Sequence, residues 1–82
     1  MEKLKVFIDW DENFGAVSEQ VDGCVSTAKT FEEVKEAYLS ALEFHLQGMA
    51  NEEIPTILQG NYKVVFELTP TALLAAKMDT GQ

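Results

Sequence analysis

The segment from Thr30 to Gly48 constrains the fold more than any other part of the sequence. It begins with Thr-Phe-Glu-Glu, a capping box, in which the Thr30 hydroxyl accepts the amide of Glu33 and the Glu33 carboxylate reaches back to the amide of Thr30. One stripe of residues then recurs at helical spacing: Val34, Tyr38, Ala41, Leu42, His45 and Met49. The pattern predicts a helix from Phe31 to about Gln47, ended by Gly48, which must bury this stripe against another element.

The sequence on both sides of this helix has the two-residue period of β-strands. Residues 4–10 alternate strictly, and one face of that strand consists of Leu4, Val6, Ile8 and Trp10. Two further short strands are predicted at 16–21 and 24–29, separated by turn signals at Gly15 and Asp22-Gly23, and a fourth at 61–68. We therefore predict an α+β domain of β-β-β-α-β order, with the helix packed on one face of a single sheet.

Charge and length limit the classes of function. The chain has 82 residues, enough for one small domain, and a net charge of −8 from 14 acidic and 6 basic residues. This excess of carboxylates disfavours nucleic-acid binding and favours attraction to a basic protein. Cys24 is the single cysteine, so an internal disulfide is excluded and a cytoplasmic location is expected. No apolar run approaches the length of about 20 residues that spans a membrane.

The acidic stretch from Asp9 to Asn13 resembles a calcium loop at first sight. Such a loop needs Gly at its sixth position and a bidentate Glu at its twelfth. Counted from Asp9, these positions hold Phe14 and Gln20, and a strand rather than a helix precedes them. The sequence therefore argues against calcium binding, and a strand end followed by a hairpin turn is the simpler interpretation.

A divalent-metal nuclease is the alternative that the same carboxylates leave open. Its metals would need Asp9, Asp11 and Glu19 to converge, with Glu67 as a further acid. His45 and Cys24 supply the remaining catalytic side-chain types, but a lone His in a helical stripe and a Cys at a strand start are typical of core positions. We expect no catalytic, cofactor-binding or metal-binding residues, and a protein-binding domain rather than an enzyme.

One segment, DGCVSTAKTFEEVKEAYLSALEFHL, resembles the HicB family of bacterial antitoxins. The similarity consists of Gly23-Cys24 before a short strand, Thr30 at the start of a helix with Glu-Glu, and the later Ala-Leu-Glu from Ala41 to Glu43. It extends over about residues 4–68. Many members of the family have Pro, Gly and Ala where this chain has Asp22, Ala28 and Val34.

The resemblance implies a partly degraded RNase H-like fold for residues 1–69. It also implies a function: neutralising a small basic HicA-like toxin, which cleaves mRNA, by direct contact and without catalysis. Residues 70–82 resemble the lead-in to a C-terminal DNA-binding domain, which promoter autoregulation would require. Besides the nuclease, a free-standing protein-interaction domain with no toxin is the other alternative. Homo-oligomers are common in the family, and we expect one here. Asp11, Glu12 and Glu19 are the residues that charge alone suggests for partner binding.

Overall fold

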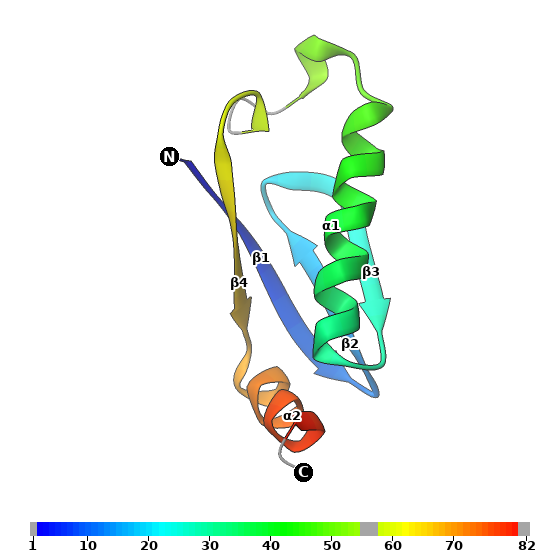
Figure 1. Ribbon diagram of the computed structural model, residues 1–82, viewed down its shortest axis with the longest axis vertical. Coiled ribbons are helices and arrows are strands. Elements are labelled where there is room, and N and C mark those ends of the chain that lie inside the picture. Colours follow the sequence, from blue (N-terminus) through cyan, green and yellow to red (C-terminus); the bar gives the residue numbers. More distant parts are fainter. Residues whose placement is uncertain (1, 55–57, 81–82) are drawn as a thin grey trace.

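The computed structural model describes residues 2–54 and 58–80 of the chain. The elements are β1 (Glu2–Asp11), β2 (Asn13–Ser18), β3 (Val21–Ala28), α1 (Phe31–Gln47), the short 3₁₀ helix η1 (Asn51–Glu53), β4 (Tyr62–Leu68) and α2 (Pro70–Thr80). The α+β class and the β-β-β-α-β order are confirmed, and α2 follows the last strand (Figure 1). Within the described part of the chain, no helix has the length and apolar character needed to cross a membrane.

The four strands form one mixed sheet in the order β3-β2-β1-β4. β1, β2 and β3 make an antiparallel meander, whereas β4 pairs with β1 in parallel, from Glu2 opposite Tyr62 to Ile8 opposite Leu68. β3 and β4 are therefore parallel edge strands, and α1 is the crossover connection between them. Antiparallel neighbours need only a turn, but a parallel return needs a connection of this kind.

The core lies between α1 and the face of the sheet that α1 covers. Val34, Tyr38 and Leu42 of α1 belong to the same buried cluster as a strand row in which Leu4, Val6 and Ile8 have no exposed surface. This confirms the predicted packing. α1 lies over β3 and β2 rather than over β4 (Figure 1). The core-facing side chains of β4 are consequently only half-buried, and a hollow remains between them and the C-terminal half of α1.

Helix α1 begins and ends at the predicted residues. The Thr30 hydroxyl accepts a hydrogen bond from the Glu33 amide at 3.1 Å and donates one to the Glu33 carboxylate at 3.0 Å. The carboxylate thus meets the hydroxyl of Thr30 and not its amide, which differs from the reciprocal bond expected of a capping box. At the other end, the amide of Gly48 donates to carbonyls of the last helical turn.

Both predicted turns are displaced. β1 and β2 are joined at Glu12 alone, which has φ 73°, so Asp11 already pairs with Asn13 and Gly15 lies inside β2 opposite Asp9. The turn between β2 and β3 is formed by residues 19 and 20. Gly23 falls within β3, where the pairing with β2 is irregular, and its φ of +82° explains why Gly stands there.

Helix α2 is attached to the end of the sheet by side chains as well as by the chain. The Thr69 hydroxyl caps the helix by accepting the Ala72 amide at 3.2 Å, and it donates to the Asp9 carboxylate at 2.8 Å. Ala72 and Ala76 are buried in the same core as the strands. Residues 70–80 therefore pack on the 1–69 domain, while residues 81 and 82 lie outside the described chain.

Candidate functional site

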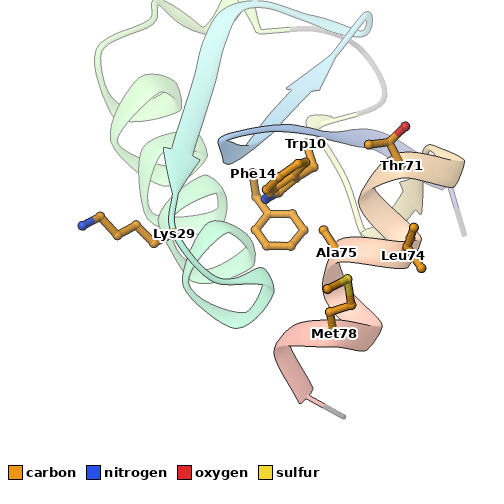
Figure 2. Close-up of a pocket in the computed structure, with 7 residues that line it drawn as sticks. All are labelled: Trp10, Phe14, Lys29, Thr71, Leu74, Ala75 and Met78. Atoms are coloured by element: carbon orange, nitrogen blue, oxygen red, sulfur yellow. The ribbon is translucent and has the colours of Figure 1, made fainter. Parts of the chain in front are cut away.

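An apolar groove lies where α2 meets the end of β1 and the start of β2. It has a volume of about 370 Å³ and is lined by Trp10, Phe14, Lys29, Thr71, Leu74, Ala75 and Met78. The two aromatic rings form one side and the helical residues the other, while the Lys29 side chain extends away from the rings (Figure 2). Leu74 is 61% exposed and Met78 68% exposed, so α2 presents apolar side chains at the rim of this groove. Exposed apolar surface of this kind is typical of binding sites.

The acidic hairpin adjoins the groove directly. Trp10 and Phe14 are paired across β1 and β2, and the next pair along the ladder is Asp11 with Asn13, closed by Glu12. Asp11, Glu12 and Asn13 are all exposed. Two carboxylates thus stand at the end of the sheet whose aromatic pair lines the groove: Glu12 in the turn, and Asp11 on the face of β1 opposite to Trp10. Both lie close enough to attract a basic partner that inserts an apolar side chain.

Glu19 does not belong to this site. It lies in the turn after β2, whereas Glu12 lies in the turn before it. At about 3.4 Å per residue, the six steps from Asn13 to Glu19 correspond to about 20 Å. The structure therefore brings together Asp11 and Glu12 of the three predicted partner-binding residues and leaves Glu19 at the opposite end of the sheet.

Asp9 has a structural role in this arrangement. Its carboxylate accepts hydrogen bonds from the Thr69 hydroxyl and from the Trp10 amide, each at 2.8 Å. The Thr69 bond, followed by the Trp10 bond, holds the pKa of Asp9 below its usual value. Asp9 thereby fixes the start of α2, and hence the helical wall of the groove, relative to the strand that carries Trp10.

The carboxylates of the nuclease alternative do not converge. Asp9 lies opposite Gly15, and Glu19 follows β2 at its far end, toward the start of β1. Throughout residues 2–54 and 58–80, no three side chains of His, Cys, Asp or Glu are grouped closely enough to hold a metal ion. The positions of Asp9, Asp11 and Glu19 therefore do not favour the alternative in which they converge around metal ions.

Cys24, Tyr38 and His45 form a separate cluster between β3 and α1. Cys24 is a buried free thiol, and burial, followed by the neighbouring Cys24, raises the pKa of the Tyr38 hydroxyl. Neither the Tyr38 hydroxyl nor Nε2 of His45 has a hydrogen-bond partner. Cys24 and Tyr38 belong to the buried core cluster, and His45 beside them is half-buried. The cluster is best described as part of the core.

Several groove residues were not among the predicted site residues. Alternation predicts Trp10 on the core face of β1, which the structure confirms, but α2 covers the ring incompletely and leaves it 36% exposed. The apolar run from Ala72 to Ala76 was a signal in the sequence, since a helix with Leu73 and Leu74 side by side must expose one of them.

Comparison of the chain with family models, with curated proteins and with solved structures gives no match.

Proposed function

We propose that this chain is the antitoxin of a bacterial type II toxin–antitoxin pair, acting in the cytoplasm. It would neutralise a small basic, HicA-like, mRNA-cleaving toxin by stoichiometric binding, with no reaction of its own. The observation that carries the proposal is the junction of the Asp11 and Glu12 carboxylates with the aromatic groove at Trp10 and Phe14. The HicB-like segment from Asp22 to Leu46 supports the assignment of the partner.

The physical basis of the proposed interaction is charge and apolar contact at one place. A chain of net charge −8 attracts a basic protein over a distance of about a Debye length and so speeds the encounter. After the encounter, an apolar side chain of the toxin would occupy the groove, while its Lys or Arg residues would face Asp11 and Glu12. An RNase that binds phosphates through basic residues loses that surface when an acidic protein covers it.

The test is inhibition of the toxin's RNase activity by variants of this chain. The proposal requires that a short basic protein be encoded beside this one and co-purify with it, and that protein is the toxin to be assayed. Trp10→Ala should raise the inhibition constant by about 10- to 100-fold, because a central aromatic contact is lost. Asp11→Asn with Glu12→Gln should slow association, most strongly at low salt. Glu19→Gln is the matched control, since it also removes a carboxylate but about 20 Å away.

Two results would contradict the proposal. One is an effect of Glu19→Gln as large as that of the hairpin substitutions, which would leave only bulk charge as the cause. The other is RNA cleavage by the purified chain itself with Mg²⁺ or Mn²⁺, abolished by Asp9→Asn, which would identify a nuclease.

A further inference from the structure

β3 is an edge strand, and its later part has none of the features that usually protect such an edge. Within the described chain, the sheet order β3-β2-β1-β4 leaves one side of β3 without a strand partner. Proteins guard edges with charged side chains, prolines or bulges, because unpaired amide and carbonyl groups attract other chains. β4, the other edge, carries Lys63 and Glu67, and the start of β3 has Asp22 and an irregular pairing with β2. Residues 24–28, Cys-Val-Ser-Thr-Ala, contain no charged residue and no proline.

The flank of α1 beside this edge leaves apolar surface uncovered. Phe44 is 80% exposed, on the side of the helix that faces β3. Between this flank and the strand lies a hollow of about 440 Å³, which is lined by Gly23, Cys24, Val25, Ser40, Ala41, Phe44 and His45. Ser26 and Ala28 lie on the core-facing side of β3 and yet are only half-buried. One more strand beside β3 would fill the hollow and cover these residues.

The two ends of the uncharged stretch carry charges of opposite sign. Asp22 precedes the stretch and Lys29 follows it, and both side chains are exposed. The Lys29 side chain extends away from the groove of Trp10 (Figure 2). A strand that runs antiparallel to β3 would complement this pattern with an acidic residue at its start, opposite Lys29, and a basic residue at its end, beside Asp22. Antiparallel pairing is also the slightly more stable arrangement per residue.

We propose that the edge of β3 binds an extended segment of a different protein, which joins the sheet as an additional antiparallel strand. The segment has an acidic residue, then alternating apolar β-branched residues, then a basic residue. Its apolar side chains lie opposite Cys24, Ser26 and Ala28, and so point to the side of the sheet that α1 covers. Backbone hydrogen bonds hold such a strand, and the hollow beneath Phe44 selects its apolar side chains. The inference concerns the edge of the sheet and does not rest on the proposed toxin.

The length of the uncharged stretch sets the expected strength of binding. In an antiparallel pair, every second residue directs both its amide and its carbonyl group to the same neighbour, so residues 24–28 offer about four to six hydrogen bonds. A short free peptide loses conformational freedom when it is ordered on the edge, and this loss offsets much of the gain. We therefore expect a dissociation constant of about 100 µM for a peptide that spans this stretch.

The probe is the peptide Glu-Val-Thr-Val-Thr-Val-Lys, acetylated and amidated so that its ends carry no charge. It is titrated into the ¹⁵N-labelled 82-residue chain up to about 2 mM and followed by NMR. The amide signals of residues 24–28 should shift and their hydrogen exchange should slow, while those of β4 stay unchanged. A control peptide has Pro in place of the central Val, and it should bind about tenfold more weakly or less, because Pro donates no hydrogen bond to the ladder.

Variants of the chain test the contact with α1 and the direction of the strand. Phe44→Ala should raise the dissociation constant by about tenfold, because the peptide loses its aromatic contact. Leu39→Ala is the matched control, since Leu39 is 43% exposed on the opposite flank of α1, and it should have little effect. Lys29→Gln should raise the constant by about threefold, but only for the peptide that starts with Glu and not for one that starts with Gln. Circular dichroism checks that each variant is folded.

Four results would overturn the inference. The first is the absence of any shift at about 2 mM peptide, or shifts centred on β4 instead of β3. The second is an equal effect of Phe44→Ala and Leu39→Ala, and the third is an effect of Lys29→Gln that does not depend on the first residue of the peptide. The fourth is hydrogen exchange of residues 24–28 that slows as the chain alone is concentrated, which would assign the edge to a second copy.

Discussion

Replacing Tyr38 by Phe should stabilise the protein, although it removes a polar group from the middle of the core. Tyr38 has 0% exposed surface, and its hydroxyl has no hydrogen bond of ordinary geometry, with the weakly polar Cys24 thiol as its neighbour. In the unfolded chain the hydroxyl is bonded to water, so folding loses those bonds without replacement. A buried, unsatisfied polar group costs about 1–3 kcal/mol. Because the neighbouring Cys24 thiol recovers a small part of this cost, we expect Tyr38→Phe to raise the free energy of unfolding by about 1 kcal/mol.

The assay is thermal and urea unfolding followed by circular dichroism. For a domain of this size, about 1 kcal/mol corresponds to a rise in Tm of about 4–8 °C. Tyr62→Phe is the control: the half-buried side chain lies on the edge strand β4, and its substitution should change the free energy by less than about 0.5 kcal/mol.

The pH dependence gives a second, independent measurement. Burial, followed by Cys24, raises the pKa of Tyr38 in the folded state above its ordinary value of 10.0. The wild type therefore keeps the contribution of neutral Tyr38 below pH 10 and loses it as the pH rises toward the raised value, by up to about 1.4 kcal/mol per pH unit. Tyr38→Phe has no such group, so its advantage should grow above pH 10. A variant that is less stable than wild type by about 1 kcal/mol would refute this reasoning and indicate that the hydroxyl is bonded to Cys24.

Two further predictions concern the ends of β1 and α2. Thr69→Ala removes the cap of α2 and the bond to Asp9, and should lower the free energy of unfolding by about 1 kcal/mol in urea titrations. The folded pKa of Asp9 is lowered from 3.8, so the stabilisation by the ionised carboxylate is present above pH 3.8 and is lost as the pH falls through the lowered value. Thr69→Ala removes the larger cause of this shift, so the variant should lose less stability in acid than the wild type does. Glu12 adopts a φ of 73°, a left-handed conformation that costs a non-glycine residue about 1 kcal/mol. Gly adopts this φ without that cost, so Glu12→Gly should raise Tm, whereas Glu12→Ala should leave Tm unchanged.

The elements with local signals were predictable. The capping residues of α1, its stripe and the terminal Gly48 are all contained within residues 30–49, and the helix has the predicted bounds. The core faces of β1 and β4 follow from alternation, and Leu4, Val6 and Ile8 are buried as expected. In these segments each local preference agrees with the fold, which is why the sequence alone was sufficient.

The turns and the groove were harder to predict from the sequence, for physical reasons. The turn after β1 is made by Glu12, which adopts a left-handed φ that its residue type rarely takes. Gly15 is the residue that normally indicates a turn, and the prediction of a turn there is wrong because Gly15 lies within β2. The separation of Glu19 from Asp11 follows from this shift, since β2 begins earlier than predicted and ends before Glu19. The groove depends on how α2 packs, and the bond from Thr69 to Asp9 joins residues 60 positions apart, for which no local signal exists.

The position of β1 in the sheet has a consequence for the order of events during synthesis. β1 leaves the ribosome before the other three strands of this sheet, yet one of its two neighbours is β4, which ends at Leu68. Until that strand is made, the meander and α1 can assemble while one side of β1 carries unpaired amide and carbonyl groups. β4 then pairs with β1 across a long stretch of chain, and contacts between residues so far apart in sequence form slowly. During synthesis, β1 is therefore temporarily an edge strand, although it is an inner strand of the finished sheet. A partner or a chaperone that acts early could bind to this exposed edge.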